Sequence, residues 1–472
     1  MSANGYKDSL VQNIKRNNSD YRDSGFTDDD NNSNIENELE GENKTKMSPL
    51  NITTNNETKI QKQKILTLNN IMCIANLLAS TLGAGAFVYP YILYQIGIIN
   101  FLFVFIFISI TVYYSLDLLR RFVVDSKLFS FGFIVERTLG ALWLKIYAIS
   151  SFLFYMSCIV NYLDFLYKFI KGLDDFFEKG WIKFFFFLIS CIIEILLCIF
   201  TNKISKIHYL SLIVVCLFIV ILLVLIIKTI IVFKDGEFKS FALFTIEDKD
   251  HNKNTNWTSF LFIMAKIIEL FYGFIYHSSF PTLLSGLDNI SNENTKKVQN
   301  LSYIALVIFY SFFTFFSCSF YDESLNLTFE EGVKISNKFL KCSFSCILIL
   351  LFLTLIPIRY IVIRDNYSSL FGQEELPLKY EIIITSICLI INNLIVYFTG
   401  NSNNFISQVM HYFGGALGVF ICFVLPVISY IAINRKAKLR AIIGYIIAGI
   451  FIVIGFFSIF YNFQSKDDKT EE

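Results

Sequence analysis

Long apolar runs alternate with short polar segments over most of the chain. A membrane-spanning helix needs about 20 mostly apolar residues, and eleven segments after residue 64 have or approach that length. We therefore expect an all-α polytopic membrane protein with eleven transmembrane helices. The spans are predicted at residues 67–92, 96–119, 142–167, 183–201, 208–233, 257–284, 300–320, 340–363, 380–399, 405–433 and 440–463.

The ends of the chain are polar. Residues 1–64 are rich in Asn, Asp, Glu and Lys, and such a segment cannot bury enough surface to offset its chain entropy. We predict a disordered cytosolic tail at 1–64, an eleven-helix membrane domain at 65–463 and a short polar C-terminal tail at 464–472.

Composition supports this division. Hydrophobic residues make up 54% of the chain and charged residues 17%, against about 25% charged in soluble domains. These values argue against a soluble enzyme or a nucleic-acid-binding protein, and they make the lipid bilayer the expected partner. The ten cysteines all lie in apolar segments without a CxxC pair, so neither a metal site nor a cofactor is predicted.

Positive charges orient the predicted helices. With a cytosolic N-terminus, the nine arginines fall in the tail or at loops that follow even-numbered spans. Short-loop lysines, such as Lys203 and Lys206, agree with this orientation. An odd number of spans then places the C-terminus on the opposite side. Both the plasma membrane and a vacuolar or other endomembrane are compatible with this topology.

Glycine and proline interrupt the first predicted span. Gly83 and Gly85 follow Ser80 and Thr81 at mid-membrane depth, and glycine weakens a helix because it gives up the most conformational freedom. Pro90 removes a further backbone donor and opens the hydrogen-bond ladder. Taken alone, these residues are explained more readily by close packing or a proline kink than by a binding site.

The sixth predicted span repeats the pattern. It contains Gly273, a polar step at His277-Ser278-Ser279, and Pro281. Interrupted segments at matching positions of two halves point to a transporter's binding site, because unwound backbone in a membrane must line a cavity. Freed amides of the first span can hold a carboxylate, and freed carbonyls of the sixth can accept from an ammonium group. This combination predicts a site for an α-amino acid.

At these residues the chain resembles the amino acid/auxin permease family, which includes the sodium-coupled neutral and the vesicular inhibitory amino acid transporters. The resemblance covers about residues 67–460 and implies a LeuT-type fold, with two inverted five-helix repeats, an eleventh helix and alternating access around a central site. The residues that carry it are Asn76, Gly83, Gly85 and Pro90-Tyr91 in the first span, Phe274-Ile275-Tyr276-His277 in the sixth, Ile356-Pro357-Ile358-Arg359 in the eighth, and Gly414-Gly415-Ala416-Leu417-Gly418 with Leu425-Pro426 in the tenth.

The resemblance also implies binding residues by position. Backbone amides would bind the carboxylate of the substrate, two hydroxyl residues would line the floor, and the sixth span would supply carbonyls and side-chain walls. These residues are Gly83, Ala84 and Gly85 for the amides, Ser80 and Thr81 for the floor, and Tyr272, Gly273 and Phe274 for the walls.

One departure concerns the coupling ion. In sodium-coupled members, the counterpart of Asn76 coordinates the ion together with a hydroxyl on the eighth span. The matching stretch here, residues 347–352, has no hydroxyl, and Ser345 is close but displaced. We therefore expect proton coupling or facilitated transport ahead of sodium coupling, with Asn76 and Ser345 as the candidate ion site.

Ionisable residues within spans are costly and therefore functional candidates. Glu194, in the fourth span, fits a proton relay and a structural hydrogen bond equally well. Lys266 and Glu269 are three residues apart and share a helix face, which favours a structural ion pair at the outer vestibule over a gate. His277 is a candidate for gating or proton movement, and His411 is a weaker one.

Together these features predict a secondary transporter for amino acids, by symport or by facilitated transport, rather than an enzyme. Neutral, aromatic and cationic amino acids all fit. One alternative is an amino-acid-sensing receptor built on a transporter fold, which would keep the site and lose turnover. The other is an integral-membrane acyltransferase using His277 or His411, which would explain neither the paired breaks nor their spacing.

Overall fold

The structure is a computed structural model that describes residues 67–171, 180–201, 204–234, 256–318, 338–371, 377–399, 408–433 and 438–470. The predicted tail at 1–64 lies outside these ranges. The final described helix runs on to Thr470, past residue 463, where we predicted the last span to end.

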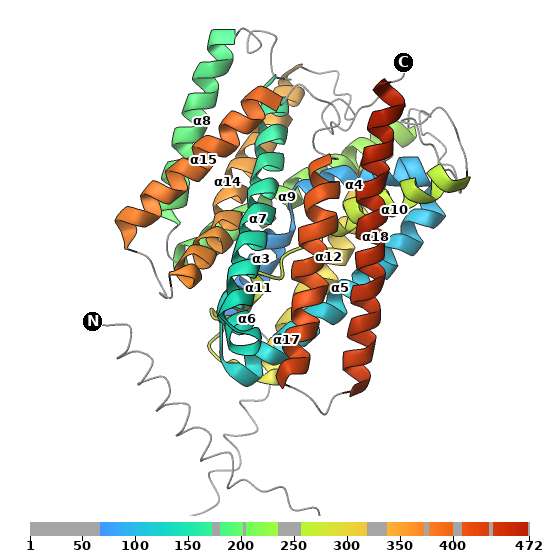
Figure 1. The fold of residues 1–472 in the computed structure, drawn as a ribbon. Coiled ribbons are helices and arrows are strands. Elements are labelled where there is room, and N and C mark those ends of the chain that lie inside the picture. Colours follow the sequence, from blue (N-terminus) through green and yellow to red (C-terminus); the bar gives the residue numbers. More distant parts are fainter. Residues whose placement is uncertain are drawn as a thin grey trace, which may run out of the picture. The chain divides into compact units, whose positions relative to one another are not determined.

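All regular structure in the described residues is helical (Figure 1). Two consecutive π-helical segments, η3 and η4, lie in the predicted tenth span. The elements are α3 (Leu68–Thr81), α4 (Ala84–Ile96), α5 (Ile98–Ser126), α6 (Phe131–Leu139), α7 (Ala141–Lys171), α8 (Gly180–Phe200), α9 (Ile204–Lys234), α10 (Asn256–Tyr272), α11 (Phe280–Leu284), α12 (Asn292–Cys318), α14 (Lys338–Leu370), α15 (Leu378–Thr399), η3 (Met410–Gly418), η4 (Phe420–Val424), α17 (Leu425–Ile433) and α18 (Lys438–Thr470).

The helices are those of an integral, multi-pass membrane protein. Within the described ranges, eight spans are long and apolar enough to cross a bilayer, and the bent α3–α4 pair makes a ninth if it counts as one span. The eight correspond to the predicted second, third, fifth and seventh to eleventh spans. The predicted fourth span contains α8, and the predicted sixth contains α10 and α11.

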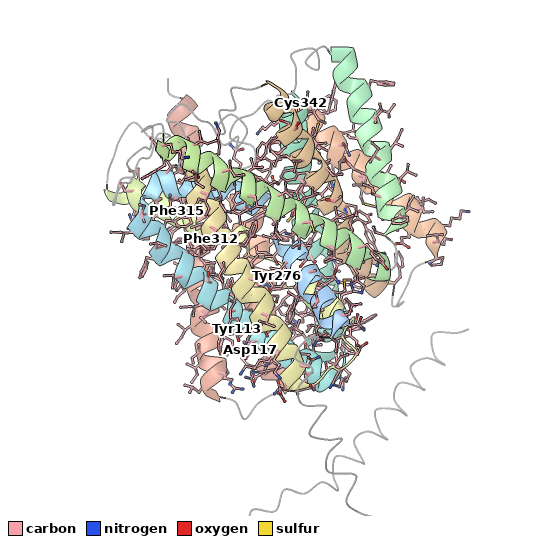
Figure 2. The ribbon with its side chains drawn as sticks, turned by 180° about the vertical axis from the view of Figure 1, so that it is seen from behind. Tyr113, Asp117, Tyr276, Phe312, Phe315 and Cys342 are labelled. Atoms are coloured by element: carbon pink, nitrogen blue, oxygen red, sulfur yellow. The ribbon has the colours of Figure 1, made fainter. Side chains whose placement is uncertain are left out.

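Large apolar side chains cover the outward faces of these helices. On α12, Phe312 and Phe315 are 51% and 54% exposed and project away from the neighbouring helices (Figure 2). On α9, exposed Leu223, Ile227 and Ile230 recur every three to four residues, which places them on one face. Such faces are suited to contact with lipid rather than with water.

The helices pack through aromatic rings and through close approaches at small residues. The Phe87 ring of α4 lies 5.3 Å from the rings of both Phe313 on α12 and Phe352 on α14, which fixes α4 against two neighbours. η3 crosses α18 where Gly415 meets Gly455, since a Cβ atom built on Gly415 would lie 3.2 Å from the Gly455 carbonyl oxygen. α8 packs mainly against α14 and α15 (Figure 1).

Candidate functional site at two helix breaks

The first predicted span breaks between α3 and α4. Leu82 and Gly83 both have extended backbone, and the axes of the two helices differ by 55°. The amides of Ala84 and Gly85 lie in the first turn of α4, so they have no partner within that helix and form part of the positive end of its dipole. They are two of the amides that we predicted to bind a carboxylate.

Pro90 does not interrupt this span. It lies inside α4, which remains helical from Ala84 to Ile96, so the ladder lacks one bond at the Ala86 carbonyl while the helix continues. α4 is buried around Pro90, with Val88 and Tyr89 fully inaccessible, and close packing keeps the helix intact.

The sixth predicted span unwinds between α10 and α11. Residues 273–279 are not helical, and α11 begins with Pro281 in its first turn, where a missing amide proton costs little. The sequence suggested that His277 follows the break, but it lies within the unwound segment. The His277 ring is fully buried, and neither ring nitrogen has a hydrogen-bond partner among the described residues.

The two breaks meet backbone to backbone. A Cβ atom built on Gly85 would lie 2.5 Å from the Cα atom of Gly273, closer than real Cβ atoms approach other atoms. At Gly83, a Cβ atom would overlap the hydroxyl of Tyr162 on α7. Glycine is therefore required at both positions by close approach rather than by backbone dihedral angles.

The hydroxyls of two tyrosines form hydrogen bonds with backbone carbonyls at the breaks. The Tyr310 hydroxyl on α12 lies 2.9 Å from the Thr81 carbonyl oxygen and 2.8 Å from that of Gly273. Tyr89 donates to the carbonyl of Leu270 at 2.7 Å. Of the carbonyls that we predicted to face an ammonium group, that of Gly273 is thus bonded to a protein donor in this arrangement.

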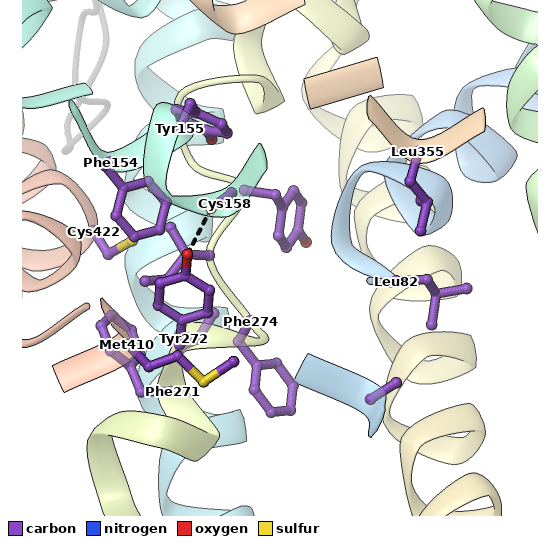
Figure 3. Packing of buried hydrophobic residues seen from close by; sticks show 14 of the residues in the cluster. Leu82, Phe154, Tyr155, Cys158, Phe271, Tyr272, Phe274, Leu355, Met410 and Cys422 are labelled. Atoms are coloured by element: carbon purple, nitrogen blue, oxygen red, sulfur yellow. Dashed lines mark hydrogen bonds between the residues drawn. The ribbon is translucent and has the colours of Figure 1, made fainter. Parts of the chain in front are cut away.

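The residues predicted to form the floor and walls of the site are buried, and their side chains point in different directions. Ser80 and Thr81 both donate to the Leu77 carbonyl, at 2.9 and 2.7 Å, so their hydroxyls bond within α3. Tyr272 points towards α7, where its hydroxyl meets Cys158 Sγ at 3.1 Å (Figure 3). Phe274 lies on the other side, with its ring 5.2 Å from that of Tyr310.

Arg359 of α14 reaches both breaks. Its Nε–H donates to the Tyr162 hydroxyl at 2.9 Å, and its terminal nitrogens donate to the carbonyls of Ile275 at 3.2 Å and Thr81 at 3.5 Å. The side chain is buried, and no carboxylate of the described residues forms a salt bridge with it. A buried cation without an anionic partner is costly, which makes this guanidinium a candidate for binding an anion.

The position of Arg359 corrects one step of the orientation argument. We counted it among the charges at loops after even-numbered spans. It lies instead inside the apolar helix stretch Cys342–Ser368 and bonds to the breaks, so its charge carries no information about orientation.

Asn76, the candidate ion ligand, bonds to a residue that the sequence did not indicate. Its Nδ2 lies 2.7 Å from Nδ1 of His208 on α9. Ser345, the other proposed ligand, is buried on α14 and is not the hydrogen-bond partner of Asn76.

Four predicted ionisable residues have close partners. Glu194 on α8 accepts from Asn393 Nδ2 on α15 at 3.0 Å. The ammonium of Lys266 lies 2.9 and 3.0 Å from the two carboxylate oxygens of Glu269, and both side chains are buried rather than in an open vestibule. His411 Nε2 lies 3.0 Å from Glu269 as well.

Sequence reasoning missed the side chains that connect the breaks. Tyr89, Tyr162 and Tyr310 come from three different spans, and no local pattern marks them. Arg359 stood in a motif that we quoted, and a lone arginine inside an apolar helix was the available signal.

Comparison with known proteins bears on this geometry. Residues 67–465 match the family model described as transmembrane amino acid transporter protein. The chain belongs to this family. No curated protein matches its sequence. Membership agrees with the resemblance noted from the sequence and indicates a transporter that is not an enzyme.

Solved structures with a similar fold are also transporters. A manganese transporter of Eremococcus coleocola, bound to an aromatic bis-isothiourea compound, aligns with a TM-score of 0.57 at 14% identity over 83% of this chain and 86% of that one. A histidine-to-alanine mutant of the same transporter aligns with a TM-score of 0.55 at 13% identity over 82% and 85%. At such identities the likeness shows a shared fold alone.

Proposed function

We propose that this family member is a secondary transporter that moves amino acids by alternating access around the two helix breaks. The observation that carries the proposal is the backbone contact between Gly85 and Gly273. Unwound segments of two helices meet there, and a membrane protein tolerates such backbone only where it serves a site. We also propose eleven spans arranged as two inverted five-helix repeats plus one helix, with a cytosolic N-terminus.

The carboxylate of the substrate binds at the start of α4 in this proposal. Amides of Ala84 and Gly85 point out of the first turn, and Arg359 supplies the only guanidinium bonded to both breaks among the described residues. Tyr162 lies between them, next to Gly83 and 2.9 Å from Arg359 Nε. Amides, a phenol and a guanidinium converging on one place are suited to a carboxylate.

The ammonium group of the substrate binds at the carbonyls of Thr81 and Gly273. Tyr310 occupies these two oxygens, so its hydroxyl has to move for the ammonium group to bind. Because the breaks are packed together, binding and release also require Gly85 and Gly273 to part. This requirement supports alternating access through separation of α3–α4 from α10–α11.

Proton coupling or facilitated transport remains our proposal ahead of sodium coupling. The stretch of α14 expected to supply a hydroxyl ligand, residues 347–352, has none. A sodium ion prefers several hard oxygen ligands, so the missing hydroxyl weakens the case for a sodium site.

Uptake into proteoliposomes tests the proposal. The purified protein is reconstituted and given a panel of labelled amino acids, with unlabelled competitors that lack either the carboxylate (an amino acid amide) or the ammonium group (an N-acetyl amino acid). We expect competition only from compounds that carry both groups. Equal competition by the amides would contradict the role of Arg359, and binding without uptake would favour the receptor alternative.

A further inference from the structure

A second buried polar cluster lies one helical turn away from the sixth-span break. It consists of Lys266 and Glu269 on α10, His411 on η3 and Ser458 on α18, and we call it the α10–η3–α18 cluster. All four side chains belong to residues that are at most 6% exposed. Three elements from distant parts of the sequence contribute to it.

Both nitrogens of the His411 ring have a partner in this cluster. Nε2 lies 3.0 Å from a carboxylate oxygen of Glu269, and Nδ1 lies 2.9 Å from the hydroxyl of Ser458. A carboxylate can only accept a hydrogen bond, so Nε2 carries a hydrogen. Nδ1 is then the atom that can either accept from the Ser458 hydroxyl or hold a proton of its own.

Aromatic rings surround these polar groups. Lys266 Nζ lies 5.6 Å from the ring centroid of Tyr91 on α4 and 5.1 Å from that of Phe262 on α10. The ring of Tyr461 on α18 lies 6.3 Å from that of His411. The charged and titratable groups that face His411 and its ion pair include Lys266 and Glu269 from α10, Tyr461 from α18 and Tyr91 from α4.

With His411 neutral, the charges of Lys266 and Glu269 balance. One more proton gives the buried cluster a net positive charge, with Glu269 facing both cations. Ser458 accommodates either form, because its hydroxyl donates to a neutral Nδ1 and accepts from a protonated one after simple rotation. The Ser458 hydroxyl therefore keeps a hydrogen bond to Nδ1 in both forms, while the attraction between His411 and Glu269 differs between them.

The cluster is mechanically connected to the break. Glu269 lies one turn before Tyr272, where α10 ends, and His411 lies one turn before Gly414. Gly414 packs on Tyr272, since a Cβ atom built there would lie 2.9 Å from the Tyr272 ring. A change in the distance between Glu269 and His411 therefore also shifts the contact between Gly414 of η3 and Tyr272 of α10.

We propose that His411 binds the proton that drives transport, within the α10–η3–α18 cluster. The step forms one N–H bond at Nδ1 with a proton taken from water on one side of the membrane. The same bond breaks on the other side, where the proton returns to water, and no electron is transferred. The proposal rests on the proposed amino acid transport and names its coupling site.

Proton flux measured beside amino acid exchange tests the assignment. Proteoliposomes carry a trapped pH-sensitive dye, and labelled amino acid is followed separately by counterflow, which needs no driving ion. We expect substrate-dependent acidification in the wild type. His411→Gln keeps a donor for Glu269 but has no basic nitrogen, so it should lose at least about tenfold in proton flux while counterflow persists.

Three outcomes would overturn the assignment. Wild-type proton flux in His411→Gln would remove His411 from the coupling step, and loss of counterflow together with proton flux would assign it a structural role. Counterflow in the wild type without any proton flux would also overturn it, yet would leave the proposed amino acid transport intact. Absence of counterflow in the wild type would instead contradict the proposed function itself.

Ser458→Ala provides a second variant that preserves the imidazole. Without the hydroxyl that accepts from Nδ1–H, the protonated form loses a hydrogen bond to a charged group. The pH midpoint of uptake should shift by about one unit to the acid side, as expected from the energy of such bonds. Ser311→Ala is the matched control, because Ser311 is exposed on α12 and its hydroxyl bonds to Val307 of its own helix. Equal midpoints in both variants would refute the proposal.

Discussion

We predict that Gly85→Ala strongly impairs transport although it adds only one methyl group, because Gly85 lies at the contact between the two breaks. The added Cβ atom would lie 2.5 Å from Gly273 Cα and 3.2 Å from Gly273 N, whereas ordinary contacts begin near 3.4 Å. Both neighbours are backbone atoms, so no side chain can rotate away. The two segments have to part by about 0.9 Å, the difference between 3.4 and 2.5 Å.

The cost of that displacement sets the expected effect on transport. Overpacking that forces backbone shifts costs about 1–3 kcal/mol. If the packed arrangement is an obligatory state of the cycle, uptake falls roughly 5- to 150-fold, since about 1.4 kcal/mol corresponds to a factor of ten. Initial rates of labelled amino acid uptake into proteoliposomes measure this effect, after normalisation to reconstituted protein.

A matched control separates the contact from the general effect of alanine. Gly449 lies on the exposed face of α18, and a Cβ atom there would meet nothing within 4 Å. Gly449→Ala should therefore transport normally and gain slightly in thermal stability, because alanine favours a helix by about 1 kcal/mol over glycine. Wild-type uptake in Gly85→Ala would refute the view that this packed contact belongs to the cycle.

Four further substitutions test single contacts. Gly83→Leu should abolish uptake without removing the protein from the membrane fraction, because Tyr162 fills the space beside Gly83. Tyr310→Phe should lower the melting temperature of the purified protein, since it leaves one or two buried carbonyls without their donor, at about 1–3 kcal/mol. Arg359→Lys should raise the apparent KM for uptake at least tenfold, because an ammonium group cannot reach Tyr162 and both carbonyls at once. Glu194→Gln should retain proton flux within about twofold if the Asn393 bond is structural, and loss of that flux in the dye assay would favour a relay.

The sequence predicted the breaks because their causes are local. Gly83 and Gly85 weaken α3–α4 by themselves, and Gly273 followed by a polar step does the same at the end of α10. Proline was a weaker guide, since Pro281 begins α11 as local rules predict, whereas Pro90 continues a helix. Both prolines are buried, so what differs is their position in the helix: Pro281 is the second residue of α11, whereas Pro90 is the seventh of α4.

The partners of the breaks could not be predicted, because helical periodicity identifies faces and not which faces meet. Lys266 and Glu269 were expected to pair, as residues three apart on one helix do. His411 joins them from 142 residues further along than Glu269, and Arg359 lies 278 residues from Thr81. The hydrogen bond between Asn76 and His208 could not be predicted for the same reason, since it depends on how closely α3 and α9 pack.

In the proposed site, selectivity for a zwitterion would follow from the way these distant groups already bond to one another. Arg359 makes its shortest bond to Tyr162 and longer ones, of 3.2 and 3.5 Å, to neutral carbonyls. A substrate carboxylate would outcompete those carbonyls for the guanidinium, because charge-assisted hydrogen bonds are about twice as strong as neutral ones. The Thr81 carbonyl would then lose the guanidinium as a donor, and in the proposed site an ammonium group on the same molecule replaces it. A ligand with only one of the two charges would leave a buried group unsatisfied, so in the proposed site discrimination comes from an exchange of partners rather than from the shape of an open pocket.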